Sequence, residues 1–107
     1  MFSSAIAFLL LGLAPQWTEG DPDKLIRAGL ERPLMVYVHA SWCGPCNQLE
    51  TDALSSPLMS KRLESVGGVM VDFDSPVGQR ITSKYRVLSL PTVLVLDTSG
   101  VERGRVE

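Results

Sequence analysis

Apolar and polar residues alternate along the chain in blocks that predict helices and strands in turn. The sequence Asp21-Pro22-Asp23 combines a capping residue with a proline, which predicts the start of a helix. This helix should end before Pro33, because proline disfavours helical geometry in the residue that precedes it. Its inner face is expected to carry Leu25, Ile26 and Leu30.

Residues 34–40 form a near-continuous apolar run that is rich in β-branched and aromatic side chains. This pattern is typical of a strand that is covered on both faces. We therefore expect residues 34–40 in the middle of a sheet. Residues 69–73 show a similar apolar pattern and predict the next strand along the chain.

Two serine-proline pairs predict further helix starts, because serine caps a helix and proline fits its first turn. Ser56-Pro57 follows a helix expected from about Cys43 and opens a segment that Gly67-Gly68 should end. Ser75-Pro76 follows the second strand. The first segment carries Leu58, Leu63 and Val66, and the second carries Val77, Ile81 and Tyr85 at fourfold spacing along one face.

The last part of the chain predicts a hairpin. Residues 92–96 are apolar, residues 97–100 have turn composition, and residues 101–106 alternate between apolar and polar as an edge strand does. The succession of strand, helix, strand, helix and hairpin predicts an α/β fold with a mixed sheet between two helical layers. Its first two strands should run parallel through a right-handed crossover.

Composition limits the size and the partners of the protein. The chain has 107 residues, 45% of them hydrophobic, which fits one domain with a single core. Ten basic and twelve acidic side chains give a net charge of −2, without a basic stripe. This balance argues against a nucleic-acid partner.

The N-terminal segment differs from the rest of the chain. Residues 5–14 are uninterrupted apolar, too short for a membrane span of about 20 residues but suited to the core of a signal peptide. We therefore expect a signal peptide or membrane anchor at residues 1–16 and one domain at residues 17–107. The alternatives are an uncleaved anchor that associates with a membrane, the tail of a longer membrane segment, and a first strand of the domain.

The two cysteines of the chain lie three residues apart in the sequence Trp42-Cys43-Gly44-Pro45-Cys46. If Cys43 lies where a strand ends and a helix begins, backbone N–H groups and the helix dipole stabilise its thiolate. Cys46, one turn further on, can then close a disulfide with it. This arrangement predicts a redox-active pair that needs neither a metal nor another cofactor.

Other interpretations of the cysteine pair are weaker. A structural zinc site needs about four ligands, and His39 is the only histidine. A structural disulfide across so small a loop constrains the unfolded chain very little. Two unrelated buried cysteines would leave Gly44-Pro45 unexplained. An exported thiol metallochaperone, holding a soft ion such as Cu(I) through the two cysteines and His39, remains an alternative function.

Residues 40–46 after the central strand and residues 88–92 before the hairpin resemble the thioredoxin family. The layout of residues 33–36, Leu49-Glu50 and Ser56-Pro57 more closely resembles the periplasmic C-terminal domain of the disulfide interchange protein DsbD and related exported thioredoxin-like proteins. The resemblance extends from about Trp17 to the end of the chain.

The resemblance implies a three-layer thioredoxin fold and a protein thiol-disulfide oxidoreductase. Gly44-Pro45 is the dipeptide of reducing thioredoxins, so we expect a reductant with a potential around −270 mV. Its implied partners are protein thiols and disulfides together with an upstream electron donor, such as a membrane thiol reductant. The implied location is the periplasm or cell envelope, and a general cytosolic thioredoxin is the alternative.

The resemblance also implies roles for residues around the cysteines. Cys43 and Cys46 would be catalytic, Pro91 would follow a cis peptide bond, and the backbone of Leu90 would bind the substrate chain. Trp42 would be an apolar platform that excludes water from the sulfurs. Gly44 and Pro45 would let the loop turn into the helix. For His39 we expect a packed, hydrogen-bonded side chain rather than a catalytic one.

The chain departs from the thioredoxin pattern in two places. Tyr37 and Met70 stand where family members commonly carry a buried aspartate and a lysine. We therefore expect the deprotonation of Cys46 to depend on water or on a nearby group such as Glu50. The fold also normally ends with a helix on the sheet, whereas this sequence ends at Glu107 near the hairpin, so a C-terminal helix is missing from the expected elements.

Overall fold

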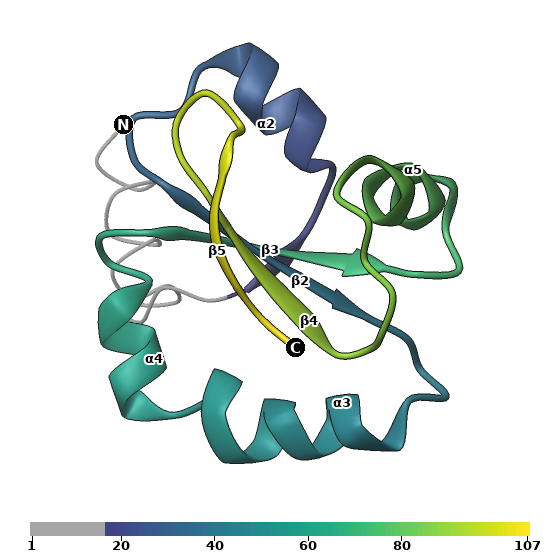
Figure 1. Ribbon diagram of the computed structural model, residues 1–107. Helices are drawn as coiled ribbons and strands as arrows, with labels where there is room; N and C mark the ends of the chain where they lie inside the picture. The colour runs from purple at the N-terminus through teal and green to yellow at the C-terminus, as the bar shows by residue number, and fades with distance from the viewer. Residues whose placement is uncertain (1–16) are drawn as a thin grey trace, which may run out of the picture.

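A computed structural model describes residues 17–107 of the chain (Figure 1). The signal peptide or membrane anchor expected at residues 1–16 lies outside the described residues. The described part is built around a single five-stranded sheet. The strands are β1 (Thr18–Glu19), β2 (Leu34–His39), β3 (Gly67–Asp72), β4 (Thr92–Leu96) and β5 (Glu102–Val106).

The sheet is mixed and has the strand order β1-β3-β2-β4-β5. β2 pairs in parallel with β3 and antiparallel with β4, and β4 and β5 form an antiparallel hairpin. The central place of residues 34–40, the parallel first pair and the final hairpin are thus confirmed. The short strand β1, which pairs in parallel with β3, was not predicted, because two residues are too few for a visible pattern.

Helices cover both faces of the sheet, as the α/β prediction required (Figure 1). In the view of Figure 1, α2 and α5 lie above the strands and α3 and α4 lie below them. The helices are α2 (Pro22–Ala28), α3 (Gly44–Leu49), the π-helical turn η1 (Glu50–Leu54), α4 (Pro57–Arg62) and α5 (Pro76–Lys84). In residues 17–107, β5 is the last of these elements.

The predicted capping residues start the helices. The side chains of Asp21, Ser56 and Ser75 each accept a hydrogen bond from a backbone N–H in the first turn of α2, α4 and α5. A proline follows each of these residues in the first turn, where its missing N–H costs nothing. Local sequence therefore sets where these helices begin.

Alternation along β2 divides the core between the two helical layers. Val36 and Val38 pack with Ile81 of α5 in one cluster. Tyr37 belongs to the other cluster, which contains both cysteines and Leu54. Successive side chains of a strand point to opposite faces, so a strand that is buried on both faces contributes side chains to both clusters.

Two sequence predictions are wrong in detail. Leu25 was expected on the inner face of its helix, but its side chain is 39% exposed. Gly67 and Gly68 do not end the preceding helix but begin β3. A Cβ atom on Gly68 would press against Leu63 and Trp17, so glycine there allows close packing.

Gly78 supports a testable prediction about the contact between α5 and β3. A Cβ atom at this position would overlap the backbone of Asp72, which cannot move without disturbing β3. We expect Gly78→Ala to lower the free energy of unfolding by about 1–3 kcal/mol, measured by urea denaturation. Gly104→Ala is the matched control, because its Cβ atom would meet no atom within 4 Å. Equal stabilities of the two variants would contradict the close contact.

Candidate active site

The cysteine pair lies where β2 gives way to α3. β2 ends at His39, and after a short turn the N–H of Cys43 donates to the carbonyl of Ala40 at 3.1 Å. Cys43 is the N-cap of α3, and its sulfur accepts a hydrogen bond of 3.1 Å from the N–H of Cys46. The two cysteines form a disulfide, with their Cα atoms 5.2 Å apart. The expected position at a strand-to-helix junction is therefore present.

The two sulfurs have different surroundings. Cys43 is 4% exposed and lines a surface groove, whereas Cys46 is completely buried and does not line it. Cys46 packs in the buried cluster that also contains Tyr37 and Leu54. A molecule that enters the groove therefore meets Cys43 first.

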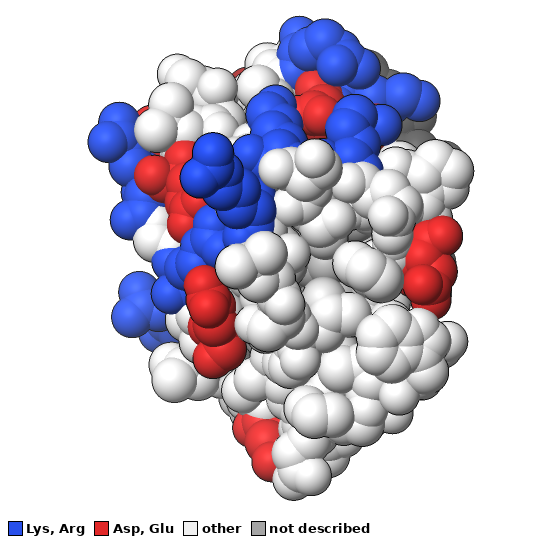
Figure 2. All heavy atoms as spheres, turned by 45° about the vertical axis from the view of Figure 1, so that its right-hand side comes forward, with Lys and Arg blue, Asp and Glu red and all other residues white. Residues whose placement is uncertain are grey.

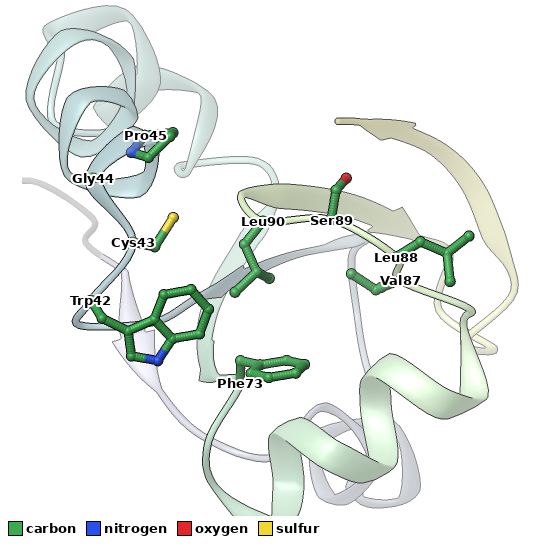
Figure 3. A pocket seen from close by; sticks show the side chains of 9 residues that line it. All are labelled: Trp42, Cys43, Gly44, Pro45, Phe73, Val87, Leu88, Ser89 and Leu90. Carbon is green, nitrogen blue, oxygen red and sulfur yellow. The ribbon is translucent and has the colours of Figure 1, made fainter.

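The groove has a volume of about 530 Å³ and runs between two segments that are far apart in the sequence (Figure 3). Residues 42–45 form one wall and residues 87–90 form the other, with Phe73 between them. The structure thus brings Trp42, Cys43, Gly44, Pro45 and Leu90 together. The bond between Leu90 and Pro91 is a cis peptide bond.

Sequence reasoning missed four residues of the groove, namely Phe73, Val87, Leu88 and Ser89. The last three directly precede the Leu90-Pro91 bond, so their place in the chain was a usable signal. Phe73 follows β3, which runs parallel to β2, and the carboxyl ends of neighbouring parallel strands meet at one edge of a sheet. The residues after both strands could have been considered together for this reason.

The Trp42 side chain is fixed by contacts with Asp74 and Phe73, but it is not buried. Its indole N–H donates to the carboxylate of Asp74 at 2.7 Å, and its ring packs edge to face on Phe73, with 6.3 Å between the ring centroids. The side chain nevertheless stays 64% exposed. The indole is thus fixed in place beside Cys43 while much of its surface remains accessible.

The Tyr37 side chain packs in the same buried cluster as both cysteines, and its hydroxyl points toward the backbone of Cys46. The hydroxyl is 2.8 Å from Oε2 of Glu50 and 3.2 Å from the carbonyl oxygen of Cys46, so it is shared between two acceptors. Burial, and then the hydrogen bond to Glu50, raise the pKa of Tyr37 well above its ordinary value. Tyr37 is therefore a protonated hydrogen-bond donor, not a base.

His39 fulfils one half of its prediction. Its ring stacks on the ring of Tyr37, with 5.1 Å between the centroids, so the side chain is packed. The expected hydrogen bond is wrong for Nε2, which is buried without a partner among the described residues. The nearby Tyr37 hydroxyl cannot serve this nitrogen, because it is directed at Glu50 and Cys46.

Within residues 17–107, no three histidine, cysteine, aspartate or glutamate side chains lie close enough together to hold a metal ion. No helix in the same part of the chain is long and apolar enough to cross a membrane.

Comparisons with known proteins agree with this geometry. A family model described as thioredoxin-like matches residues 28–98. Thioredoxin-1 of Drosophila melanogaster is 30% identical over 79 residues, which cover 74% of this chain and 70% of that protein. The thiol:disulfide interchange protein DsbD of Cronobacter sakazakii is 30% identical over 95 residues, which cover 83% of this chain but only 16% of that protein.

A solved structure gives the same result. The solution structure of a thioredoxin from Thermus thermophilus is 34% identical and superimposes with a TM-score of 0.69, covering 88% of this chain and 75% of that one. The predicted thioredoxin fold is therefore confirmed, and the disulfide lies within the residues that the family model matches. The chain belongs to the thioredoxin-like family and carries a disulfide-capable Cys-X-X-Cys pair.

Proposed function

We propose that this protein reduces disulfides of other proteins, with Cys43 as the attacking cysteine and Cys46 as the resolving one. The observation that carries this proposal is the unequal placement of the two sulfurs. Cys43 lines the groove, and Cys46 is fully buried behind it within bonding distance. A substrate disulfide can therefore reach one sulfur, while the other waits to complete the exchange.

The proposed reaction has two exchange steps. The thiolate of Cys43 attacks a substrate disulfide, forms a mixed disulfide and releases one substrate sulfur as a thiolate, which takes up a proton. The thiolate of Cys46 then attacks the sulfur of Cys43, which breaks the mixed disulfide and releases the second substrate thiolate. The substrate gains two electrons and two protons, and the protein is left as the Cys43–Cys46 disulfide.

Backbone geometry favours Cys43 as the nucleophile. The N–H of Cys46 points at the sulfur of Cys43, which caps α3. The same hydrogen bond becomes stronger when the sulfur carries a negative charge, so it stabilises the thiolate that attacks. Trp42 and Leu90, on opposite sides of this sulfur, would shield the exchange from water and contact the substrate chain. Gly44 and Pro45 shape the first turn of α3, and the cis bond before Pro91 shapes the facing segment.

The direction and the cellular setting of the reaction are the finer part of the proposal. Gly44-Pro45 supports a reductant, because low-potential thioredoxins carry this dipeptide. The apolar residues 5–14 and the similarity to a thiol:disulfide interchange protein support an exported protein in the periplasm or cell envelope. An upstream thiol donor, such as a membrane thiol reductant, would then restore the dithiol, and no further cofactor would be needed.

Glu50 is the group that we propose for removing the proton of Cys46. The Tyr37 hydroxyl lies within hydrogen-bond distance of both the Glu50 carboxylate and the backbone carbonyl of Cys46, so the carboxylate lies near the backbone of the resolving cysteine. Tyr37 itself cannot act as the base, because its pKa is raised. Other family members commonly carry a buried aspartate at the position of Tyr37. In this chain, Tyr37 would instead donate a hydrogen bond that positions the carboxylate of Glu50, a residue of η1.

A trapping experiment tests the proposed function. Cys46→Ser cannot resolve the mixed disulfide, so we expect full-length chain carrying this change to remain covalently bound to its substrates through Cys43. Mass spectrometry of the reducible adducts would identify these substrates and their compartment. The double variant Cys43→Ser, Cys46→Ser should form no adducts. Adducts that persist in the double variant, or none in Cys46→Ser, would overturn the proposal.

Glu50→Gln tests the proposed proton acceptor. We expect release of a preformed mixed disulfide at pH 7 to slow by about tenfold or more, because glutamine still accepts from Tyr37 but takes up no proton. The first attack by Cys43 should keep its rate, which quenched-flow mass spectrometry can measure separately. Glu31→Gln, a change at an exposed carboxylate, is the control. Unchanged release in Glu50→Gln would assign the proton to water.

Tyr37→Phe separates positioning from catalysis. We expect the free energy of unfolding at pH 8 to fall by about 1–2 kcal/mol, because the hydrogen bonds to Glu50 and Cys46 are lost. The stability difference should shrink above pH 10, because the raised pKa of Tyr37 makes its ionisation oppose folding there.

The exchange rate of Tyr37→Phe at pH 7 should fall by much less than the roughly 100-fold that the loss of a general base costs. Tyr85→Phe is the matched control, because the Tyr85 hydroxyl also donates to a carbonyl, that of Gly100, at 2.9 Å. A 100-fold loss of exchange in Tyr37→Phe alone would mean that the phenol takes part in proton transfer.

A further inference from the structure

The groove beside Cys43 is uncharged along its whole length. Its lining residues are Trp42, Cys43, Gly44, Pro45, Phe73, Val87, Leu88, Ser89 and Leu90. None of the nine carries a charge, and Ser89 contributes the one hydroxyl. Figure 2 turns the side of the molecule that carries α5 and the start of α3 toward the viewer. A broad uncharged area covers much of this side, with Lys and Arg gathered along its upper-left border and Asp and Glu at its right, lower-left and bottom margins.

Two side chains leave unusually large apolar surfaces exposed at this groove. Leu88 is 93% exposed and Trp42 is 64% exposed, and they belong to opposite walls, with Cys43 in the same wall as Trp42 (Figure 3). A single exposed leucine needs no explanation, as Leu58 on α4 illustrates. Two such residues across one groove beside a reactive sulfur form a contact surface instead.

The wall that carries Leu88 is held in place at both ends. The N–H of Val87 donates to the carbonyl of Thr82 in α5 at 2.8 Å, and the hydroxyl of Thr92 in β4 donates to the carbonyl of Ser89 at 2.7 Å. The opposite wall is held through the hydrogen bond from Trp42 to Asp74. Leu88 and Trp42 are thus presented on fixed backbone, which lowers the entropy cost of binding between them.

We propose that this groove selects protein disulfides whose reacting cysteine is flanked by apolar side chains, and that Leu88 determines this selection. The inference rests on the proposed function and names its substrate class. A flanking leucine or phenylalanine would bury its surface against Leu88 and Trp42 and gain the hydrophobic contribution. A flanking charge would lose water without meeting an opposite charge among the lining residues.

The test uses two symmetrical peptide disulfides that differ only beside the cysteine. One is the disulfide of acetyl-Gly-Leu-Cys-Leu-Gly-amide, and the other has serine in place of both leucines. Both flanks are uncharged, so the reactivity of the two disulfides stays similar, and division by the rate with dithiothreitol removes what difference remains. The quantity measured is the second-order rate constant for reduction by the dithiol form of the full chain.

We expect the wild-type protein to reduce the leucine peptide about tenfold faster than the serine peptide, as burial of part of a leucine side chain predicts. Leu88→Ser should lower this ratio to about threefold or less. Leu58→Ser is the control, because Leu58 is also an exposed leucine but does not line the groove, and this change should leave the ratio unchanged. A ratio near one in the wild type, or a tenfold ratio that persists in Leu88→Ser, would overturn the inference.

A small uncharged substrate separates this inference from the proposed function. Bis(2-hydroxyethyl) disulfide has no flanking side chain, so its reduction reports on the cysteine pair without peptide binding. Wild type and the control Leu58→Ser should reduce it at the same rate. If the wild type reduces neither this disulfide nor the peptides, the proposed function itself fails. If the wild type reduces this disulfide while peptide selectivity is absent, only the selectivity is wrong.

Discussion

The burial of β2 on both faces and on both edges is the constraint on which the rest of the structure depends. β3 and β4 occupy its two edges, and side chains of the two core clusters cover its faces. Because the strand cannot shift, the turn after His39 delivers Cys43 to one fixed place at the start of α3. The parallel partner β3 brings Phe73 to the same edge of the sheet, and the antiparallel partner β4 begins beside the segment that carries Leu90. The groove therefore forms where β2 and β3 end and where β4 begins.

The features that could be predicted from the sequence are those that local chemistry decides. Asp21, Ser56 and Ser75 start helices because their side chains bond to N–H groups a few residues away. The apolar run at residues 34–40 identified the central strand because a strand that is covered on both faces leaves few polar positions. The cysteine pair was legible for the same reason, since its spacing alone places both sulfurs in one turn.

The features that the sequence did not reveal depend on contacts between distant segments. Phe73 lines the groove because β3 pairs with β2, and this residue has no local signature. The π-helical turn η1 directs Glu50 toward Tyr37, a residue thirteen positions earlier, and no periodic pattern announces such a turn. His39 was expected to have a hydrogen-bond partner, but its Nε2 has none among the described residues. The neighbours of a strand residue depend on how the sheet packs in three dimensions, and the residue type alone does not predict them.

Two contrasting environments meet at one disulfide. On the side of Cys43 lies an uncharged groove with exposed apolar walls, which suits recognition of a polypeptide. On the side of Cys46 lies a buried hydroxyl that holds a carboxylate, which suits proton transfer. If the carboxylate lined the groove, it would repel the thiolate that has to form on Cys43 and the acidic segments of substrates alike. Under the proposed function, substrate binding would take place on the side of Cys43 and proton transfer on the side of Cys46, so substitutions could change binding and resolution independently.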